Sequence, residues 1–351
     1  MLLLVPITIL LLFSIFNLLG IRADLLPYQL TFLTISVFAF FLIRHIGLSF
    51  FRQNALLFYW VFIGLLIITY IIGFEARGSK RWIDLFFFSF QPSEFFKIFF
   101  VIFFADFFSA TKKTSDEVSV FFKSLFYFIL PTFIIFKQPD LGSALVYTAI
   151  YVTLLFFSYI PKRTIIISAL IAMLVLPFGW FFLHDYQKNR VISFVNPHID
   201  SQGIGYNMLQ AMITTGSGEF FGRGMGQGTQ TKLAFLPENH TDFAFSSLVE
   251  QFGFVGGLAV IVSYFGLVSI LLHKIFAYLV KTNEHDYFKS LVLIGFVAYF
   301  VFQLLVNISM NVGLFPVTGI TLPFISYGGS SLLGLMISLA LLPKPEGDGS
   351  R

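Results

Sequence analysis

The sequence contains no cysteine and few charged residues, and both absences narrow the kind of protein it can be. Without cysteine, disulfide bonds and thiolate metal sites are excluded. Lys, Arg, Asp and Glu make up 11% of the 351 residues, whereas soluble proteins average roughly 25%. Hydrophobic residues account for 57% of the chain, and the mean hydropathy is +0.86. This composition indicates that lipid, rather than water, is the main solvent of the folded chain.

Apolar runs of about 20 residues recur along the whole chain, and each is long enough to cross a hydrocarbon core of about 30 Å. The first run lacks a basic segment and a small-residue cleavage site, so we expect a retained helix rather than a signal peptide. We therefore predict an all-α, polytopic integral membrane protein with about ten transmembrane helices. The expected spans lie at roughly 3–20, 29–45, 55–74, 91–110, 121–136, 140–160, 163–184, 243–272, 288–309 and 324–342.

Phenylalanine is unusually abundant, with 50 residues. We interpret it as bulky lipid-facing surface rather than as an aromatic binding site.

Basic residues are unevenly distributed between the two predicted sides. Ten spans place both termini on one side, where twelve Lys and Arg residues fall, against five in the short loops opposite. Because cytoplasmic loops are enriched in Lys and Arg, we predict cytoplasmic termini. We expect residues 1–351 to form a single transmembrane domain, with residues 185–242 as an extracytoplasmic loop within it. A loop of this length is more often functional than idle.

Polar residues concentrate on the predicted outer side, most densely just before the eighth span. Glu238, His240 and Asp242 fall within five positions there. A carboxylate at the rim of a membrane can act as a general base, bind a cation or carry protons. This segment is therefore the first candidate for a functional site.

Further candidates on the same side each have an ordinary alternative. Glu94 and Lys97 share one helix face, which suits either a site or a structural ion pair. Asp140 follows a proline and precedes a span, so it fits a helix N-cap. Arg81 beside Trp82 fits an interfacial anchor, and Arg190 fits a solvated side chain. Their convergence on one side favours a site, and cations beside carboxylates suit a substrate with phosphates and hydroxyls.

The chain resembles the SEDS family of membrane proteins (shape, elongation, division and sporulation), which includes RodA and FtsW. The resemblance covers nearly the whole chain, and its motifs occur in the family's order. Residues 82–85, 138–142 and 316–319 look more like the elongation members, RodA, than like the division members, FtsW. The motifs are Arg81-Trp82, Gln91–Phe95, Gln138–Gly142, Gly203–Tyr206, Leu236–Phe243 and Leu322–Ser331.

The resemblance implies a peptidoglycan glycosyltransferase that polymerises lipid II on the outer face of the cytoplasmic membrane during cell elongation. It implies that Asp242 is the catalytic residue, and Asp242 would take the proton from the attacking sugar hydroxyl. The chain departs from the family pattern at Ala244 and Gln251, which leaves Asp242 and its neighbours intact. The residues expected to bind substrate are Arg81, Glu94, Lys97, Asp140, Arg190, Glu238, His240 and Ser326.

Within this set, Arg81, Lys97 and Arg190 would hold the departing diphosphate, and Glu94 would orient Lys97. A divalent cation, Mg²⁺ or Mn²⁺, bridging a carboxylate and the diphosphate is compatible with this chemistry, but the sequence does not establish a metal site. The expected partners are the nascent glycan strand and a transpeptidase of the class B penicillin-binding type, with no nucleic acid.

Three other functions compete with elongation-specific polymerisation: a division-specific polymerase like FtsW, a lipid II transporter or flippase, and a scaffold without chemistry. A transporter is expected to show polar groups near the bilayer midplane and on both faces. Here the polar groups crowd the outer side, which favours the enzyme.

Overall fold

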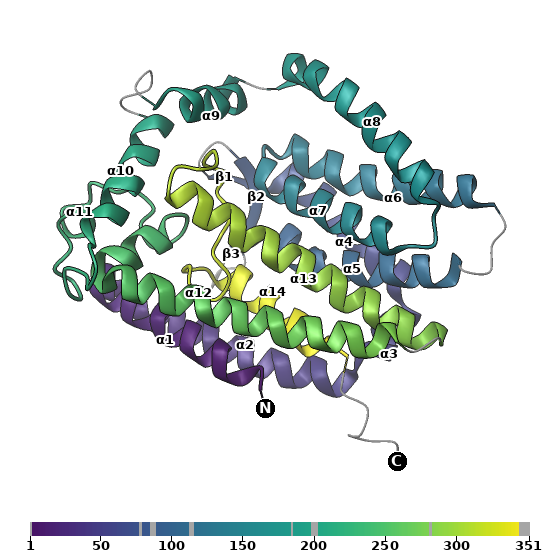
Figure 1. Cartoon of the computed structure of the whole chain (residues 1–351), viewed down its shortest axis with the longest axis horizontal. Helices are drawn as coiled ribbons and strands as arrows, with labels where there is room; N and C mark the ends of the chain where they lie inside the picture. Colours follow the sequence, from purple (N-terminus) through teal and green to yellow (C-terminus); the bar gives the residue numbers. More distant parts are fainter. Residues whose placement is uncertain are drawn as a thin grey trace. The chain divides into compact units, whose positions relative to one another are not determined.

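The computed structural model describes residues 2–76, 79–84, 89–111, 116–183, 185–197, 203–280 and 283–343, and these are mainly helical (Figure 1). The helices up to residue 182 are α1 (Leu4–Ile21), η1 (Ala23–Leu25), α2 (Leu26–Ile46), α3 (Leu48–Gln53), α4 (Ala55–Ile72), α5 (Pro92–Ala110), α6 (Glu117–Lys137), α7 (Leu141–Phe157), α8 (Lys162–Gly179) and η3 (Trp180–Phe182). They are followed by α9 (Asp185–Val195), α10 (Ile204–Ser217), α11 (Thr229–Lys232), α12 (Ala244–Leu279), α13 (Glu284–Asn311) and α14 (Gly329–Ala340). The strands are β1 (Phe74–Ala76), β2 (Ser79–Asp84) and β3 (Ser89–Phe90).

The chain divides into two compact units, each built from three segments of the sequence. Unit 1 comprises residues 1–34, 178–270 and 301–332, and unit 2 comprises residues 35–177, 271–300 and 333–351. The predicted site residues in unit 1 are Arg190, Glu238, His240, Asp242 and Ser326, and those in unit 2 are Arg81, Glu94, Lys97 and Asp140.

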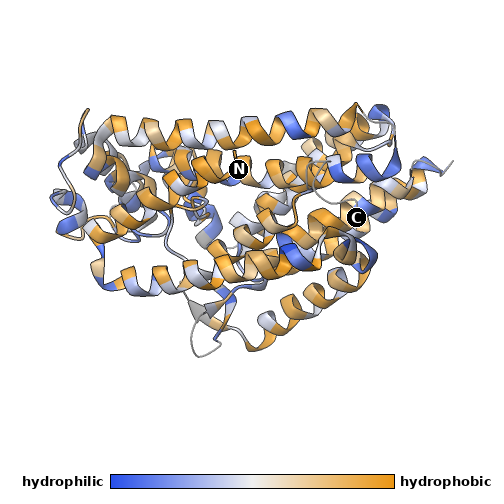
Figure 2. Ribbon diagram, turned by 90° about the horizontal axis from the view of Figure 1, so that it is seen from below, coloured by the Kyte–Doolittle hydropathy of each residue, from blue (hydrophilic) through white to orange (hydrophobic). Residues whose placement is uncertain are grey.

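Each of the ten predicted spans coincides with a helix, namely α1, α2, α4, α5, α6, α7, α8, α12, α13 and α14. Within the described residues, six helical segments are long and apolar enough to cross a membrane, and α7 and α14 are shorter apolar helices. Hydrophobic residues dominate these helices in Figure 2. The all-α, multi-pass membrane fold is confirmed, although length and composition alone support fewer than ten full spans.

Helix α5 is buried on almost every side, which decides the role of many phenylalanines. Phe96, Phe100 and Phe104 have no more than a trace of exposure. The Phe100 ring packs edge-on against Tyr147 of α7, with ring centroids 5.0 Å apart. A helix that is apolar all round belongs in an interior. The expectation that phenylalanine mainly faces lipid is therefore wrong for α5, although other phenylalanines, such as Phe38 at 70% exposed, do face outward.

A small antiparallel sheet precedes α5 and was not expected from the sequence. Strand β2 pairs with β1 on one side and with β3 on the other. The second pairing sets Ile83 opposite Phe90, so the chain turns back just before Pro92. Proline suits the first turn of a helix because it lacks an N–H that would have no partner there. The sheet thus places Arg81 in a strand close to the start of α5.

Helix α12 contains a break, and residues 219–224 of the preceding loop form hydrogen bonds with the backbone groups around it. Gly253 has a φ of +69°, which is not helical. The segment 219–224 lies against the break: the N–H of Arg223 donates to the carbonyl of Glu250 at 2.8 Å, and that of Phe254 donates to the carbonyl of Glu219 at 2.9 Å. Backbone groups freed within an apolar span must find such partners. The long loop and the helix after it are therefore one hydrogen-bonded structure.

Candidate functional site

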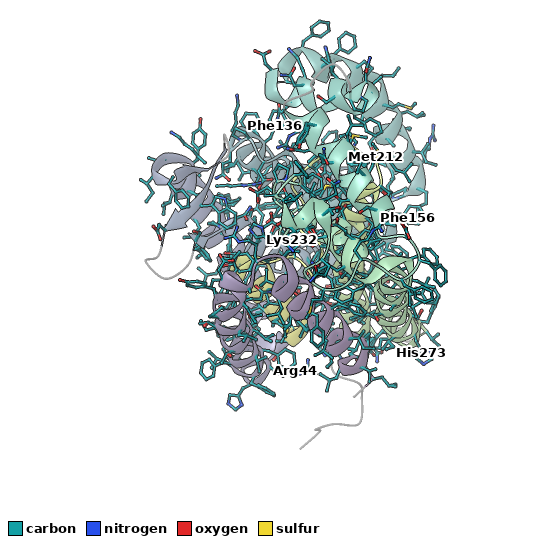
Figure 3. The ribbon with its side chains drawn as sticks, turned by 90° about the vertical axis from the view of Figure 1, so that its left-hand side faces the viewer. Arg44, Phe136, Phe156, Met212, Lys232 and His273 are labelled. Carbon is teal, nitrogen blue, oxygen red and sulfur yellow. The ribbon has the colours of Figure 1, made fainter. Side chains whose placement is uncertain are left out.

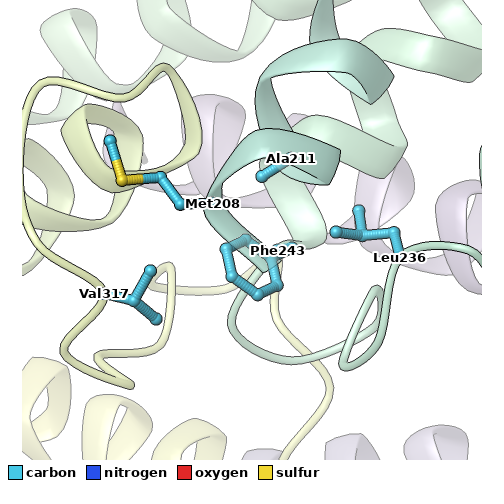
Figure 4. Packing of buried hydrophobic residues seen from close by; sticks show 5 residues of the cluster. All are labelled: Met208, Ala211, Leu236, Phe243 and Val317. Atoms are coloured by element: carbon cyan, nitrogen blue, oxygen red, sulfur yellow. The ribbon is translucent and has the colours of Figure 1, made fainter. Parts of the chain in front are cut away.

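The turn that carries Asp242 is fixed at both ends by a buried hydrophobic cluster. Leu236 before the turn and Phe243 after it are each 1% exposed, and they pack with Met208 and Ala211 of α10 and with Val317 (Figure 4). Helix α10, which lies within the long loop, forms one side of this cluster. The cluster leaves the polar residues between its two ends to form the turn.

Within the turn, Glu238 accepts hydrogen bonds that close the chain on itself. Its φ of +54° is uncommon for a residue other than glycine. Its carbonyl accepts from the N–H of Thr241 and that of Phe243, both at 3.1 Å. Its carboxylate accepts from the Thr241 hydroxyl at 2.8 Å. Strained backbone held by such contacts is common at functional sites, and here it sets the direction in which Asp242 leaves the turn.

Two asparagines on α13 hold the backbone of Asp242. The Nδ2 atoms of Asn307 and Asn311 donate to its carbonyl at 3.0 and 3.1 Å. Asn311 Oδ1 also accepts from the N–H of Ser246 at 3.0 Å, which satisfies a free donor in the first turn of α12. Both asparagines are fully buried. The amide pair therefore positions the residue without using its carboxylate.

Asp242 is half-buried as a residue, and its carboxylate lies beside a glycine in the segment after α13. Gly319 has a φ of +72°, and a methyl group built on it would lie 3.6 Å from Asp242 Oδ2. Glycine adopts this conformation without steric cost. The bare backbone at this position keeps one side of the carboxylate uncrowded.

The segment before α14 closes over the same turn and brings in the predicted residue Ser326. The hydroxyl of Ser326 donates to the carbonyl of Thr241 at 2.6 Å. The N–H of Tyr327 donates to the carbonyl of His240 at 2.8 Å, and the two rings lie 5.7 Å apart. The structure thus brings Glu238, His240, Asp242 and Ser326 together. Arg190 lies half-buried on α9, a helix of the same unit that packs against α10.

Glu250 is a further carboxylate eight residues after Asp242, and its contacts are structural. It is fully buried. Its carboxylate accepts from the backbone N–H of Gln230 at 2.8 Å and from that of Thr231 at 3.1 Å. These donors begin the short helix α11, so Glu250 ties the end of the long loop to α12.

Unit 2 brings Arg81 and Asp140 together as an ion pair, with Arg81 Nη1 3.2 Å from Asp140 Oδ1. Asp140 is 2% exposed and also accepts from the N–H of Ser143, so the predicted N-cap of α7 is confirmed. Its Oδ2 accepts from the Ser143 hydroxyl at 2.8 Å and from Gln91 Nε2 at 3.2 Å. The capping role and the ion pair therefore coexist.

These contacts set the protonation of Asp140, which precedes the apolar helix α7. Burial raises the pKa of this carboxyl, whereas the Arg81 guanidinium and the Ser143 donors lower it. The second influence prevails, and the pKa of Asp140 lies below its ordinary value. The group is therefore a carboxylate at neutral pH.

Glu94 and Lys97 form the predicted pair on α5. Lys97 Nζ lies 2.5 Å from Glu94 Oε1, and the Lys97 side chain is 3% exposed. A buried ammonium normally requires a partner, and Glu94 supplies it. Lys97 also acts electrostatically on Asp140. The four polar residues predicted for unit 2 thus form one connected group.

Unit 1 contributes the carboxylates of Glu238 and Asp242, unit 2 contributes two pairs of a cation and a carboxylate, and the described residues hold no cluster of three or more His, Asp or Glu side chains able to bind a metal. Mg²⁺ is commonly held by one or two carboxylates together with substrate phosphates. The donor set fits that kind of shared site rather than a metal cage made by protein alone.

Sequence reasoning missed Asn307, Gly319 and the role of Asn311. The two asparagines are four residues apart in an apolar helix, and polar side chains inside a span usually mark function. That spacing was the available signal. Nothing in the sequence near Gly319 indicates that it lies beside Asp242.

Comparisons with known proteins show which proteins the chain is similar to. A probable peptidoglycan glycosyltransferase FtsW of Hydrogenovibrio crunogenus is 34% identical over 325 residues, covering 90% of this chain and 80% of the relative. The peptidoglycan glycosyltransferase MrdB of Escherichia coli K12 is 36% identical over 291 residues, covering 81% and 75%. A chain in a structure described as "Structural coordination of polymerization and crosslinking by a peptidoglycan synthase complex" is similar with a TM-score of 0.82 and 26% identity, covering 97% of this chain and 95% of that one.

Fold and sequence together define a multi-pass membrane protein with an acidic turn beside its longest loop. Residues 2–345 match the family of cell cycle proteins that comprises FtsW, RodA and SpoVE, and the chain belongs to that family. The resemblance noted from the motifs is thereby confirmed.

Proposed function

We propose that the chain is a peptidoglycan glycosyltransferase that polymerises lipid II into glycan strands and releases undecaprenyl diphosphate. The relatives named as peptidoglycan glycosyltransferases match most of its length. The observation that carries the proposal is the Asp242 turn, whose carbonyl is held by Asn307 and Asn311 while its carboxylate stays partly accessible.

In the proposed reaction, the C4 hydroxyl of the incoming lipid II attacks the anomeric carbon of the growing strand. A C–O bond forms there as the bond to the diphosphate breaks. Asp242 takes the hydroxyl proton, which makes a weak nucleophile competent at neutral pH. A positioned general base of this kind contributes roughly 10²–10⁴-fold to the rate.

The leaving diphosphate requires positive charge as it departs. We assign this role to Arg81, Lys97 and Arg190. Asp140 and Glu94 are bound to the first two and keep their charged groups in place before substrate arrives. A divalent cation, Mg²⁺ or Mn²⁺, held between one carboxylate and the diphosphate would add to this charge. Glu238, His240 and Ser326 complete the substrate-binding set through the turn that they shape.

The proposal places the protein in the cytoplasmic membrane, with both termini in the cytoplasm and the Asp242 turn outside. It assigns the enzyme to cell elongation, because its motifs resemble RodA more than FtsW. A class B penicillin-binding transpeptidase is the proposed partner, and the similarity to a chain of a polymerising and crosslinking complex supports it.

The test is polymerisation of lipid II by the purified full chain in detergent, read as glycan length on gels. Asp242→Asn keeps the size of the side chain but removes the base, so we expect the rate to fall about 10²–10⁴-fold while lipid II binding persists. The matched control is Asp185→Asn, which makes the same charge change at an exposed residue of α9.

Full polymerisation by the Asp242→Asn protein would remove Asp242 as the base. If the unmodified chain moves lipid II between leaflets of a vesicle but forms no polymer, alone or with the transpeptidase, the protein is a transporter and the proposed function is wrong.

A further inference from the structure

Unit 2 contains a cavity of about 820 Å³ that the proposed reaction does not use. Arg44 lies in the last turn of α2, and Phe288 and Lys289 lie near the start of α13. Because both helices are long enough to cross a membrane, the cavity lies at the depth where lipid headgroups meet water. The side chains that matter most in its lining are Arg44, Arg52, Asp106, His285, Phe288 and Lys289.

The guanidinium of Arg44, which is labelled in Figure 3, is held by hydrogen bonds to the C-terminal end of α14. Its Nη1 donates to the carbonyls of Ala340 and Leu342 at 3.0 and 2.6 Å, which are among the free acceptors at the C-terminal end of α14. Among the residues that the structure describes, Arg44 has no carboxylate partner. Its positive charge is oriented but not neutralised.

Arg52 and Asp106 neutralise each other on another wall of the cavity. Arg52 Nε lies 2.8 Å from Asp106 Oδ1, and its guanidinium stacks 4.3 Å from the centre of the Phe288 ring. Arg52 also lies 3.9 Å from Glu284. The only carboxylate that lines the cavity, within the described part of the chain, is thus already bound to a cation.

The surroundings of Arg44 add positive charge. Lys274, near the end of α12, lies close enough to Arg44 for the two cations to repel each other. Lys274 likewise has no carboxylate partner among the described residues. Lys289, which also lines the cavity, lies 3.3 Å from Asp286 and keeps 18% of its side chain exposed. The cavity lining therefore includes an uncompensated cation, Arg44, and the partly exposed ammonium of Lys289, and Lys274 adds positive charge near Arg44 from outside the lining.

The exposed surface of α2 that precedes Arg44 in the sequence is apolar. Phe38, Phe41 and Leu42 are 70%, 66% and 50% exposed. A ligand with a charged phosphate and hydrocarbon chains would place its phosphate in the cavity and its chains along this face. A free phosphate ion would make only the first of these contacts.

We infer that this cavity binds the headgroup of an anionic phospholipid, with its phosphate between Arg44 and Lys289. Basic pockets between membrane helices favour such headgroups, especially on the cytoplasmic side, where the proposed topology places the cavity. A charged hydrogen bond from Arg44 and the charge of Lys289 supply the attraction.

The test measures lipid binding to the full chain in detergent by native mass spectrometry, with dioleoyl phosphatidylglycerol and dioleoyl phosphatidylcholine as probes. We expect the anionic lipid to bind at least about tenfold more tightly. Arg44→Gln and Lys289→Gln should each weaken that binding about tenfold. Lys123→Gln, the same charge change on the exposed face of α6 outside the cavity, should leave it unchanged.

Lys289→Gln tests the inference even where Arg44→Gln fails to fold, since Arg44 also holds the end of α14. Equal binding of the two lipids, or undiminished phosphatidylglycerol binding in a folded Lys289→Gln protein, would overturn the inference. Inorganic phosphate is the third probe. If it binds as tightly as phosphatidylglycerol and with the same sensitivity to both substitutions, the site is one for free phosphate, and the inference is wrong.

Discussion

At Asp242 the hydrogen bonds from α13 are made to the backbone carbonyl. Asn307 and Asn311 bind the carbonyl. They therefore fix the position of Asp242 without forming hydrogen bonds to its carboxylate. Gly319, whose backbone faces the carboxylate, keeps space at that side. A proton acceptor needs this combination of fixed position and open approach.

Gly319→Ala tests the importance of that space. The methyl group would stand 3.6 Å from Asp242 Oδ2 in a backbone with φ of +72°. We expect a loss of about 1–2 kcal/mol in the free energy of unfolding and a fall in polymerisation of about tenfold or more, because the methyl group would occupy space beside the carboxylate that the substrate hydroxyl needs for its approach. Thermal unfolding and lipid II polymerisation measure the two effects.

Gly47→Ala is the matched control. Gly47 has a similar φ of +84°, but its added methyl group would meet nothing closer than the Ser49 hydroxyl at 4.0 Å. The Gly47→Ala protein should lose the same free energy of unfolding, but its polymerisation rate per folded molecule should not fall. Equal loss of activity in both variants would mean that the space beside Asp242 is unimportant.

The ion pair of Arg81 and Asp140 should make stability depend on pH. Because the pKa of Asp140 is lowered in the folded chain, its contribution is full above the ordinary Asp pKa of about 3.9 and is lost as the pH falls through the lowered value. We expect Asp140→Asn to destabilise the protein at pH 7 by about 1.5–3 kcal/mol. The difference from the unmodified chain should shrink below about pH 4.

Thermal unfolding in detergent at pH 7 and at pH 3 measures this difference. The exposed Asp185→Asn variant is the control and should show no such dependence. If the difference in stability between the Asp140→Asn protein and the unmodified chain stays constant or grows in acid, the assigned pKa direction is wrong.

Residue-level prediction from the sequence succeeded where partners are near in the chain. The pair of Glu94 and Lys97 follows from their spacing on a helix, and the Asp140 cap follows from its position before a span. Arg81 and Asp140 are far apart in sequence, so no helical or strand period relates them. Their pairing depends on how β2 and α7 pack, which only the folded chain specifies.

At the scale of elements, the end of the long loop depends on a single buried carboxylate. Glu250 accepts the N–H groups of Gln230 and Thr231 that begin α11. Glu250→Gln replaces one acceptor oxygen by a donor, which faces donors already there. We expect a loss of about 1–3 kcal/mol and faster hydrogen exchange of residues 229–232, measured by mass spectrometry.

Glu219→Gln supplies the control within the same loop. Glu219 is exposed at 69% and pairs with Arg223 on the surface, and such pairs are worth little. Its substitution should leave exchange at residues 229–232 unchanged. Unaltered exchange in the Glu250→Gln protein would show that the loop has another anchor.

The sequence predicted the long helices well, but it did not predict the break in α12 or the small sheet. Each of the ten apolar runs coincides with a helix, because length and hydropathy are properties of each segment alone. The break at Gly253 gave no comparable signal, because its hydrogen-bond partners come from residues 219–224. The three-strand sheet was missed because its strands are short and lie between two long apolar runs.

At the scale of the whole molecule, the exposed apolar residues of the helices define what the lipid must cover. Phe38 lies near the middle of α2 and is 70% exposed. Phe38→Lys should oppose membrane insertion by about 2.5–3.5 kcal/mol. The fraction of protein that resists carbonate extraction from membranes measures the effect.

Phe221→Lys is the matched control, because Phe221 is 80% exposed but lies between α10 and α11, outside the helices that can span a membrane. It should insert normally. Equal loss of inserted protein in both variants would show that the exposed face of α2 does not face lipid.

The contact between the loop and the broken helix is made by two glycines that touch backbone to backbone. A Cβ on Gly222 would come within 2.6 Å of the Gly253 nitrogen, and a Cβ on Gly253 within 2.3 Å of the Gly222 nitrogen. Neither position can accept a larger residue by a compensating change at the other, since each is already the smallest. Grafting this loop into a related protein would therefore require transplanting residues 250–255 with it, because the two segments fit only each other.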